Sequence, residues 1–531
     1  MLGEFFRRYL KFLWLTPALL LWGSFPPLAE KTDILFALAP LMYLTRHSGR
    51  RDPKGVALVW FVNGLTFYLA TLSWMPAIVK NGGPWPLVAL GMGALSAYCA
   101  LYFAAYGYVA TCVWDWVRSR NYAWRLAAII VVEPLLWAGL EIVRSRFGGG
   151  FAWNQLGTVA VNAGFGAPAG LGGVYLLSML IVLINGTLVG IAERVFRKGG
   201  TSLETILPLI FVFGTFELAK WTTPQPSESE GEGKTMKVAL VQRNFPCVFN
   251  PEREENPQLV YSNLLSKVAL LAPELVVLPE SAMAEFGRLD RHNAFRFAEW
   301  VRELTGAEAV IAGGTRVEQS KVYNSAGMFQ EERVDFYDKV HLVPFGEYIP
   351  GDKLIPALQK LAPVGSCTAG DLKLLGDFGV AICYEDTDSA QMRRLAKMGA
   401  KALVFITNDS WFGYSEEPVQ HAWQAVARAI ETGLAVVRVG NSGVSGTIAP
   451  DGSATWLVDG KGRMLLDTPG TMFDRVILAQ TSASGGLTWY VRLGDKPIFI
   501  AFLLLMAAIF MVKYKRTLEI IRLRRRYGSD E

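Results

Sequence analysis

The stretch that decides the fold of this chain is DFGVAICYED, residues 377–386. It begins with a mostly apolar run of strand length that ends on Cys383, and Tyr384 and two acidic residues follow. In open α/β sheets, reactive side chains lie just beyond the carboxyl ends of the strands. The stretch therefore predicts a buried strand that presents the thiol of Cys383 at the edge of a sheet.

Two other strand-length runs end on reactive side chains. Residues 274–279 (ELVVLP) lead into Glu280, and residues 334–338 lead into Lys339. A cysteine thiol is mostly protonated near neutral pH, so a nucleophilic cysteine needs a nearby base or positive charge. Glu280 is suited to accept the proton, and Lys339 is suited to face the oxyanion of a tetrahedral intermediate, with the backbone N–H of Tyr384 as a second donor. This combination predicts acyl transfer through a thioester.

The sequence around these residues alternates between strand and helix patterns. Strands are expected at 236–242, 274–279, 308–312, 322–329, 377–383, 402–407 and 434–439. Helices are expected at about 257–271, 292–305, 387–399 and 418–432. Such alternation indicates an α/β layered domain with buried strands. We assign this domain to residues 236–488.

Upstream of this domain the chain is strongly apolar. A membrane-spanning helix needs about 20 mostly apolar residues. Segments of about this character lie at 9–27, 32–45, 55–76, 87–114, 122–142, 170–192, 204–220 and, after the domain, 497–513. We therefore expect a bundle of seven spans in residues 1–221, a linker at 222–235 and a C-terminal membrane helix at 497–513. The segment 32–45 is short, and an interfacial or re-entrant segment is the alternative there.

The basic residues predict which way the protein faces. If all eight spans form, the clusters on one side are Arg7, Arg8 and Lys11; Arg46, Arg50, Arg51 and Lys54; Arg118, Arg120 and Arg125; Arg194, Arg197 and Lys198; and the tail 514–531. By the positive-inside rule, both termini are cytoplasmic and residues 236–488 lie outside. The expected setting is a bacterial inner membrane, with the α/β domain in the periplasm. A cleaved signal peptide is the alternative for the first segment.

The composition agrees with a membrane protein and argues against several other classes. Of 531 residues, 51% are hydrophobic and 19% charged, whereas soluble domains carry about 25% charged residues. The net charge is +5 and is concentrated in the C-terminal tail, so the chain lacks the basic face that nucleic-acid binding needs. Five scattered cysteines and four histidines show neither CxxC nor HExxH spacing, so we expect no disulfide framework, metal or cofactor.

Two acidic residues, Glu133 and Glu141, fall in or near the fifth apolar segment. An ionisable group inside a membrane span is costly and often functional, so a transport role is one interpretation. The other is structural, with Glu133 paired inside the bundle and Glu141 at the interface beside Arg144.

Four motifs carry a resemblance to known proteins. They are LPES (278–281), YDKVHLVPFGEY (337–348), CYE (383–385) and NDSWFG (408–413). In this order they resemble the nitrilase superfamily, whose triad is Glu, Lys and Cys. With the apolar segments on both sides, the whole chain resembles the apolipoprotein N-acyltransferase family. The resemblance implies an αββα sandwich next to an α-helical transmembrane bundle of about eight spans.

The resemblance also implies roles for individual residues. By it, Glu280 is the general base, Lys339 stabilises the intermediate and Cys383 is the nucleophile. Residues implied to support the site or bind substrate are Glu347, Tyr384, Glu385 and Trp411, the last in a loop near the substrate entrance.

The same resemblance implies the substrates. An acyl chain moves from a phospholipid, typically phosphatidylethanolamine, to Cys383 and then to the free α-amino group of a lipoprotein's diacylglyceryl cysteine. Both substrates are lipids, so the active site is expected to open at the level of the bilayer. Residues 345–365 alternate apolar groups with Pro and Gly, and either an arm on the outer leaflet or a packed loop fits this pattern.

Two other functions remain open from the residues alone. One is a membrane-tethered amidohydrolase that uses the same triad with water as acceptor. The other is a lipid-binding or transport protein whose nitrilase-like domain is inactive. We expect structural roles for His341 and His421, and no nucleophilic role for Cys247 and Cys367, which lack an acid and lysine context in the sequence.

Overall fold

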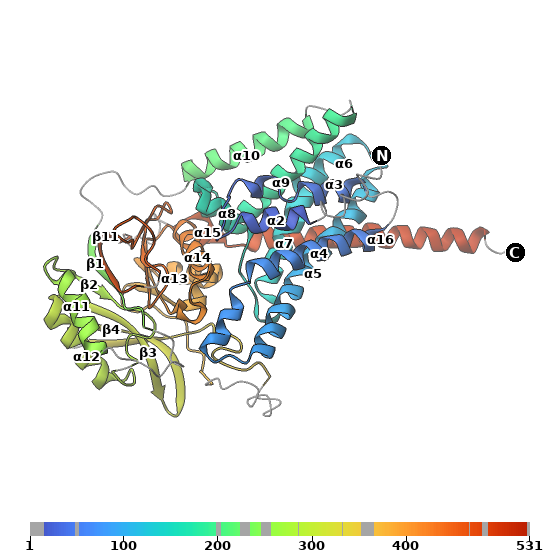
Figure 1. The fold of residues 1–531 in the computed structure, drawn as a ribbon. Coiled ribbons are helices and arrows are strands. Elements are labelled where there is room, and N and C mark those ends of the chain that lie inside the picture. The colour runs from blue at the N-terminus through green and yellow to red at the C-terminus, as the bar shows by residue number, and fades with distance from the viewer. Residues whose placement is uncertain are drawn as a thin grey trace.

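The computed structural model describes residues 15–47, 52–197, 203–222, 234–245, 256–284, 286–331, 333–351, 366–466, 468–479 and 487–527. These residues form a helical part and an α/β part that pack against each other (Figure 1). The last helix, α16, points away from the α/β part, so its far end and the α/β part lie at opposite ends of the molecule.

The helical part contains long helices joined by short turns. Its elements are α2 (Thr16–Gly23), η1 (Asp33–Leu35), α3 (Ala39–His47), α4 (Pro53–Thr71), η2 (Met75–Asn81), α5 (Trp85–Val117), α6 (Tyr122–Ala127), η3 (Ala128–Val132), α7 (Glu133–Arg144), η4 (Phe147–Gly149), α8 (Leu156–Ala160), η5 (Val161–Phe165), α9 (Ala169–Arg197), α10 (Leu203–Thr222), α15 (Trp489–Leu493) and α16 (Lys496–Tyr527).

Five helical stretches among the described residues are long and apolar enough to cross a membrane. They are Pro53–Asn81, Trp85–Val117, Tyr122–Arg144, Ala169–Val195 and Lys496–Glu519. Each overlaps one of the expected spans, so five of the predicted helices are confirmed. The predicted total of about eight spans is not.

Of the other three expected spans, 32–45 is wrong, 204–220 forms a helix, and 9–27 lies partly outside the described residues. Residues 32–45 do not form one helix, because η1 is a single turn and α3 starts afresh with Pro40 in its first turn, where a missing N–H is tolerated. The helix α10 is 20 residues long but is not one of the five candidates. Segment 9–27 begins outside the described residues. Most of the linker 222–235 and the end of the tail 514–531 also lie outside them.

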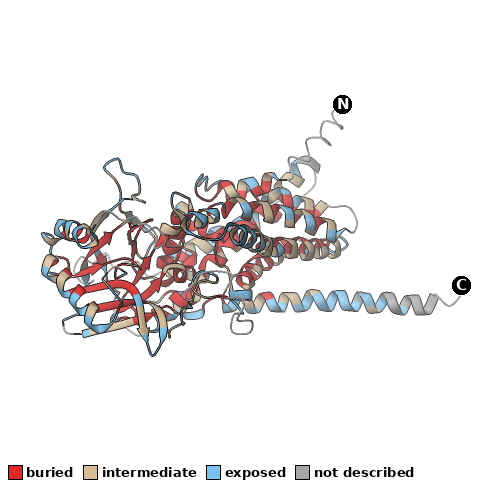
Figure 2. Cartoon of the chain, turned by 60° about the horizontal axis from the view of Figure 1, so that its bottom comes forward, coloured by how far each residue is buried: buried red, intermediate tan, exposed pale blue. Residues whose placement is uncertain are grey.

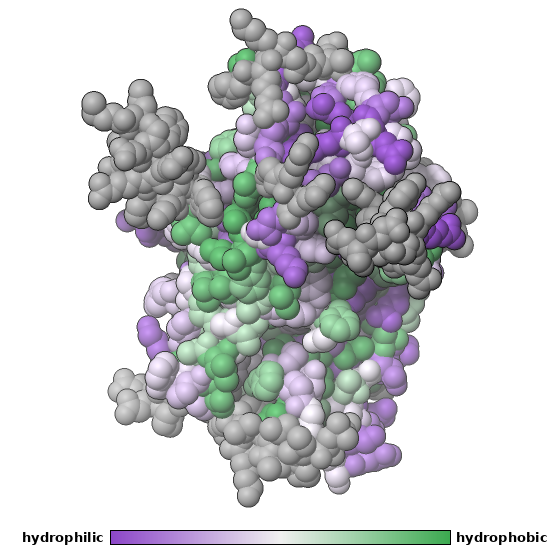
Figure 3. Space-filling model, turned by 90° about the vertical axis from the view of Figure 1, so that its right-hand side faces the viewer, coloured by the Kyte–Doolittle hydropathy of each residue, from purple (hydrophilic) through white to green (hydrophobic). Residues whose placement is uncertain are grey.

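The helical part exposes large apolar side chains. Those on α10 include Leu209, Ile210, Phe211 and Phe213, and those on α16 include Leu503, Leu504, Phe510 and Met511. Most of α16 stands clear of the rest of the protein in Figure 2, and Figure 3 shows hydrophobic side chains gathered over the flank of the helical part. Soluble proteins rarely expose apolar surface on this scale. These helices have the surface of segments that contact lipid.

Glu133 pairs inside the bundle, as the structural interpretation predicted. Its Oε2 lies 2.6 Å from Nη2 of Arg46 on α3, and both side chains are about 2% exposed. Trp114 of α5 donates its Nε1–H to Glu133 at 2.8 Å. Glu141 instead accepts from Trp137 Nε1 and from the backbone N–H of Leu156. Both acids therefore join helices of the bundle.

Replacing Glu133 with glutamine should destabilise the protein by about 3–5 kcal/mol, because Arg46 would keep a buried charge without its partner. Thermal unfolding of the detergent-solubilised protein measures this as a lower midpoint. The matched control is Glu217→Gln, which removes an exposed pair with Lys220 on α10 and should cost less than about 1 kcal/mol. Equal midpoints for the two variants would contradict a stabilising role for the buried pair.

Two sheets form the centre of the α/β part. In the described residues, the first sheet has the order β11 (Gly470–Ile477), β1 (Thr235–Gln242), β2 (Leu275–Val277), β3 (Ala309–Glu318), β4 (Lys321–Gln330) and β5 (Arg333–Asp338). The second has the order β10 (Ala454–Trp456), β9 (Gly446–Ile448), β8 (Val436–Gly440), β7 (Ala402–Thr407) and β6 (Phe378–Ile382). The seven strands predicted by their apolar runs are confirmed. Strands β9, β10 and β11 were not predicted, because the first two are three residues long and β11 contains Asp474 and Arg475.

The sheets pack face to face between two layers of helices. Val238, Val277, Val380 and Ile406 belong to one buried cluster between the two sheets. The other face of the first sheet is covered by α11 (Pro257–Ala269) and α12 (Arg291–Thr305), and that of the second by α13 (Ser389–Lys397) and α14 (Glu417–Thr432). This is the expected αββα arrangement.

Helix α14 joins the α/β part to the helical part. Nearly all of its residues are buried, because one side covers the second sheet and the other packs on α9. Glu431 accepts a hydrogen bond from the backbone N–H of Val174 on α9 at 2.9 Å. The catalytic candidates in the second sheet are thus held at a fixed position against the membrane helices.

Candidate active site

Cys383 is the first residue of the short helical turn η7 (Cys383–Thr387), directly after β6. Its φ of 54° lies in the left-handed region, which is unfavourable for a residue with a Cβ and is often seen at functional sites. Glu385, two residues on, stabilises the turn by accepting a hydrogen bond from the backbone N–H of Ile382 at 2.9 Å. The turn therefore places the thiol just beyond the carboxyl end of β6.

Glu280 follows β2 and lies against β3. A Cβ at Gly313 of β3 would come within 2.2 Å of the Glu280 carbonyl oxygen, so this close approach requires a glycine. The side chain of Asn324 on β4 donates to Glu280 Oε1 at 2.7 Å and to Glu347 Oε1 at 2.7 Å. Asn324 therefore fixes the two carboxylates relative to each other.

Lys339 follows β5 and is 1% exposed. Its Nζ lies 3.0 Å from Glu347 Oε1, and Glu347 Oε2 accepts from the backbone N–H of Val343 at 2.8 Å. Burial opposes the charged form of Lys339, but Glu347, Cys383 and Glu280 outweigh it and raise its pKa. The structure thus keeps a buried positive charge beside the thiol.

The electrostatics of Glu280 and Cys383 suit proton exchange between them. Burial is the main cause that raises the pKa of Glu280 to about 7, with Glu347 adding to the rise and Lys339 opposing it. Burial and then the charge of Glu280 raise the pKa of the Cys383 thiol well above its usual range, against the effect of Lys339. The thiol is therefore neutral at rest and needs a base, and a carboxyl with a pKa near 7 can take up and return a proton near neutral pH.

Glu385 clamps the segment that carries Lys339 to the turn that carries Cys383. Its buried carboxylate accepts hydrogen bonds from the backbone N–H groups of Val340 and His341 at 2.7 and 3.0 Å. Tyr337 donates its hydroxyl to the same carboxylate at 3.0 Å. Glu385 thus fixes the segment after Lys339 relative to the turn of Cys383.

Tyr384 and the loop of Trp411 face the helical part. The ring of Tyr384 stacks on Trp153 with centroids 6.4 Å apart, and its hydroxyl lies 3.5 Å from the carbonyl oxygen of Gly150. Asn81 of η2 donates to the carbonyl oxygen of Trp411, in the turn η8 (Asp409–Phe412), at 2.8 Å. The residues around the thiol therefore contact the loops of the membrane helices.

The structure brings together Glu280, Lys339, Glu347 and Cys383, and Tyr384 and Glu385 lie in the turn of Cys383. Trp411 lies in η8, which contacts η2 of the helical part. One prediction is corrected. Cys367 does have an acid and lysine context, because Glu347, Lys339 and Glu280 all act on its thiol. Burial is the main cause that raises the pKa of Cys367 to about 11. The context was missed because it is assembled from distant segments. Cys247, Arg7 and residues 352–365 of the expected arm lie outside the described residues.

Sequence reasoning also missed polar residues that organise the site. Asn324 lies in the middle of the apolar-rich run 322–329, beside Ser325, and a polar amide at such a position is the signal that could have revealed it. His341 has a structural contact with Asp388, 3.8 Å away, and its ring packs edge-on against Tyr384. His421 belongs to a larger buried group behind Cys383.

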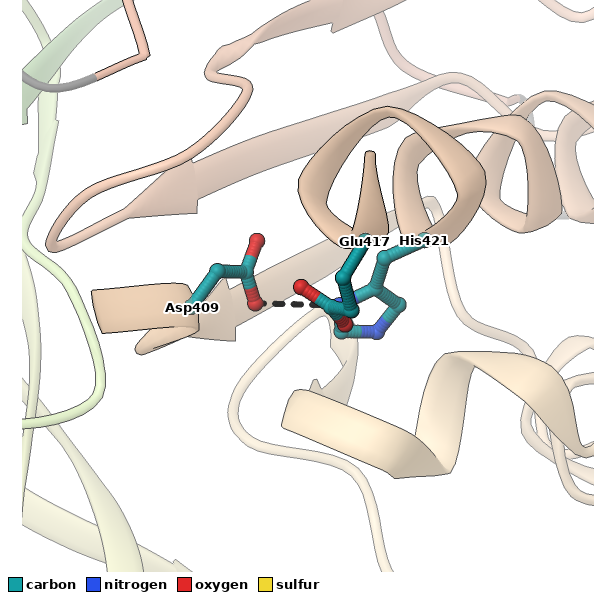
Figure 4. Close-up of side chains that lie close together, drawn as sticks. All are labelled: Asp409, Glu417 and His421. Atoms are coloured by element: carbon teal, nitrogen blue, oxygen red, sulfur yellow. Dashed lines mark hydrogen bonds and ion pairs between the residues drawn. The ribbon is translucent and has the colours of Figure 1, made fainter. Parts of the chain in front are cut away.

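Three side chains, Asp409, Glu417 and His421, offer potential metal ligands that lie within 4.8 Å of one another (Figure 4). Both ring nitrogens of His421 are already occupied, by Asp386 at 2.9 Å and Asp409 at 3.0 Å. Arg438 adds a second positive charge against the same two aspartates. This arrangement supplies the positive charge that a metal would bring.

The α/β part has a nitrilase-like fold, and two family models match the chain. Residues 237–481 match the carbon-nitrogen hydrolase family, and residues 17–187 match the apolipoprotein N-acyltransferase N-terminal domain. The crystal structure of Saccharomyces cerevisiae Nit3, a member of branch 10 of the nitrilase superfamily, is 17% identical with a TM-score of 0.35, covering 46% of this chain and 90% of that chain.

Relatives with known names extend over both parts. Apolipoprotein N-acyltransferase of Geobacter metallireducens is 32% identical over 89% of this chain and 89% of its own length. That of Shewanella oneidensis is 30% identical over 85% of this chain and 86% of its own length. The chain belongs to the apolipoprotein N-acyltransferase family and is a membrane-associated enzyme.

Proposed function

We propose that this protein transfers an acyl chain from a phospholipid, with phosphatidylethanolamine as the donor class, to the N-terminal α-amino group of a lipoprotein's diacylglyceryl cysteine. The transfer proceeds through a thioester on Cys383. The observation that carries the proposal is a neutral thiol placed with a carboxyl of pKa about 7 and a buried lysine, beside loops of the membrane helices.

In the first step, Glu280 accepts the thiol proton while the sulfur attacks the ester carbonyl of the phospholipid. Lys339 and the backbone N–H of Tyr384 stabilise the resulting oxyanion. The tetrahedral intermediate collapses, the C–O bond to the glycerol oxygen breaks, and Glu280 gives its proton to that oxygen. The products are a thioester on Cys383 and a lysophospholipid.

In the second step, the α-amino group of the lipoprotein attacks the thioester carbonyl. Glu280 accepts a proton from the amine, the C–S bond breaks, and the proton returns to the sulfur of Cys383. The products are an amide on the lipoprotein and the free thiol. Closure of the site against water favours the amine as acceptor.

We further propose that the protein lies in a bacterial inner membrane with residues 236–488 in the periplasm and both termini in the cytoplasm. Supporting this, α16 carries Lys513, Lys515 and Arg522 toward the end of the molecule that lies away from the α/β part. Because basic segments remain on the cytoplasmic side, the α/β part would face the periplasm. Labelling of single introduced cysteines in residues 236–488 from outside intact spheroplasts tests this orientation.

The proposed reaction is tested with the purified protein in mixed micelles, supplied with a defined phospholipid and a synthetic diacylated lipopeptide. The expected products are a triacylated lipopeptide and one lysophospholipid per transfer. Release of free fatty acid without lipopeptide acylation, or ammonia from small amides, would favour an amidohydrolase instead.

The rate of Cys383 acylation should rise with pH through about 7 and level off above it. Glu280 must be ionised to accept the thiol proton, and at pH 6 roughly a tenth of a group with a pKa near 7 is ionised, so the rate should be about tenfold below its plateau. Single-turnover acylation without lipopeptide measures this, since the acceptor amine titrates as well. A flat profile between about pH 5.5 and 8.5 would contradict the assigned base.

A further inference from the structure

Behind the nucleophile turn, four buried side chains form a closed ring of alternating charge. Asp386 Oδ1 lies 2.9 Å from His421 Nε2, and His421 Nδ1 lies 3.0 Å from Asp409 Oδ1. Asp409 Oδ2 lies 3.3 Å from Arg438 Nη2, and Arg438 Nη1 lies 2.5 Å from Asp386 Oδ2. All four side chains are at most 2% exposed. The mechanism above uses none of them.

The ring joins four different elements. Asp386 belongs to η7, which begins with Cys383, and Asp409 begins η8, which contains Trp411. His421 projects from α14 toward Asp409, as Figure 4 shows, and Arg438 comes from β8. Each cation contacts both aspartates, so η7 and η8 are bridged twice. The turn with the thiol cannot shift relative to its neighbour without breaking buried ion pairs.

The charges of the ring balance. Each nitrogen of His421 faces a carboxylate, and a neutral imidazole has a proton for only one of them. Burial opposes the charged ring, but Asp386 and Asp409 outweigh it and raise the pKa of His421 to about 10. The remaining neighbour, Glu417, lies 3.6 Å from His421, and burial followed by the charge of Asp409 raises its pKa well above the usual range. Two cations thus face two anions and a neutral carboxyl.

The ring also reaches the membrane helices through the residue before His421. Gln420 accepts hydrogen bonds from Trp153 Nε1 at 2.9 Å and Trp74 Nε1 at 3.4 Å. It donates to the carbonyl oxygens of Pro26 and Thr71 at 3.1 and 3.2 Å. The same turn of α14 that supports the nucleophile turn is therefore fixed to the helical part.

We propose that Asp386, His421, Asp409 and Arg438 are positioning residues that hold the Cys383 turn against η8 and the membrane helices for the thioester step. This inference rests on the proposed function. The charge of Asp409 acts on both Glu280 and Cys383 and raises the pKa of each. Besides Asp409, the charged or titratable groups that act on Glu280 are Lys339 and Glu347, and those that act on Cys383 also include Glu280. Without the positive charge of His421, the negative charge of Asp409 is less well neutralised and acts more strongly on Glu280 and Cys383. The ring therefore affects both the position of the Cys383 turn and the pKa values of Glu280 and Cys383.

The test compares His421→Gln with the charge-balanced double variant His421→Gln, Asp409→Asn. In single-turnover acylation, we expect H421Q to be slowed roughly 10–100-fold, since small displacements of a reacting group cost this much, with the phospholipid KM changed little. The acid limb of its pH profile should lie at a higher pH than that of the wild type. In the double variant the limb should return toward that of the wild type.

The control is Glu133→Gln, which breaks a buried pair in the bundle away from the ring. It should keep the wild-type acid limb even if it lowers stability. A wild-type acylation rate and pH profile in H421Q would overturn the inference. A slower rate in H421Q with the same acid limb and the same KM as in E133Q would also overturn it. If the wild type forms no acyl adduct on Cys383, the proposed function fails instead, and the two failures are distinguished.

Discussion

Replacing Cys383 with alanine is expected to lower lipopeptide acylation by about 10⁴-fold or more, the scale seen when a nucleophile is removed from a catalytic group that acts as a unit. The physical reason is that Glu280 and Lys339 stabilise only steps in which sulfur attacks or leaves. The variant should fold, because cysteine and alanine are both small and Cys383 begins a turn that Glu385 stabilises. Measurement uses the mixed-micelle transfer assay and the unfolding midpoint.

Cys367→Ala is the discriminating control for this experiment, because its thiol also lies within the field of Glu280, Lys339 and Glu347. It should still form the acyl adduct on Cys383. Full transfer by C383A would show that Cys383 is not the nucleophile. Loss of the adduct in C367A with retention in C383A would show that Cys367 carries the acyl chain instead.

Replacing Glu280 with glutamine should slow acylation of Cys383 by roughly 10²–10⁴-fold, the range for loss of a general base. Glutamine keeps the size of the side chain and a carbonyl oxygen to accept the Asn324 hydrogen bond, but it cannot take the thiol proton. The remaining activity should also lose the rise near pH 7, since the group that titrates there is gone. Single-turnover acylation across pH measures both effects.

The matched control is Glu318→Gln on the same sheet, whose side chain is 59% exposed and pairs with Arg316. It should leave the rate and the pH profile unchanged. An E280Q variant that keeps the wild-type rate, or a slow one that keeps the pH rise, would remove Glu280 from the role of base.

Much of the α/β part could be predicted because its strands are buried on both faces. The runs that became β1, β2, β6 and β7 are apolar and short, and those of β2 and β6 lead directly into Glu280 and Cys383. The prediction that Glu280, Lys339 and Cys383 form one site rested on the rule that reactive side chains lie just beyond the carboxyl ends of strands. The pattern did not show that the three residues come from two sheets. Glu280 and Lys339 follow β2 and β5 of the first sheet, and Cys383 follows β6 of the second.

The helical part was harder because hydropathy does not determine helix length. Residues 32–45 are mostly apolar, but the helix breaks before α3. Asn185 of α9 donates to the carbonyl oxygen of Ile34 and accepts from the Leu38 N–H at 2.9 Å across this break. A tertiary hydrogen bond of this kind compensates for the broken backbone pattern. The local sequence does not predict these hydrogen bonds with Asn185.

The polar residues behind the site could not be found from spacing. Asp386 and Arg438 are separated by 52 positions, and Asp409 and His421 by 12, so the ring exists only once β6, β7, β8 and α14 are packed. A structural role was predicted for His421, but its place beside the nucleophile turn depends on the tertiary fold.

The central claim is that Cys383 carries the acyl chain between two lipids. The most direct measurement is intact and peptide mass spectrometry of the purified protein after incubation with a phospholipid of one defined acyl chain and no lipopeptide. The proposal predicts one acyl group per protein, hydroxylamine-labile and located on the peptide that contains Cys383, which disappears when the diacylated lipopeptide is added. Transfer to the lipopeptide without any acylated protein, or an acyl group confined to another residue, would contradict it.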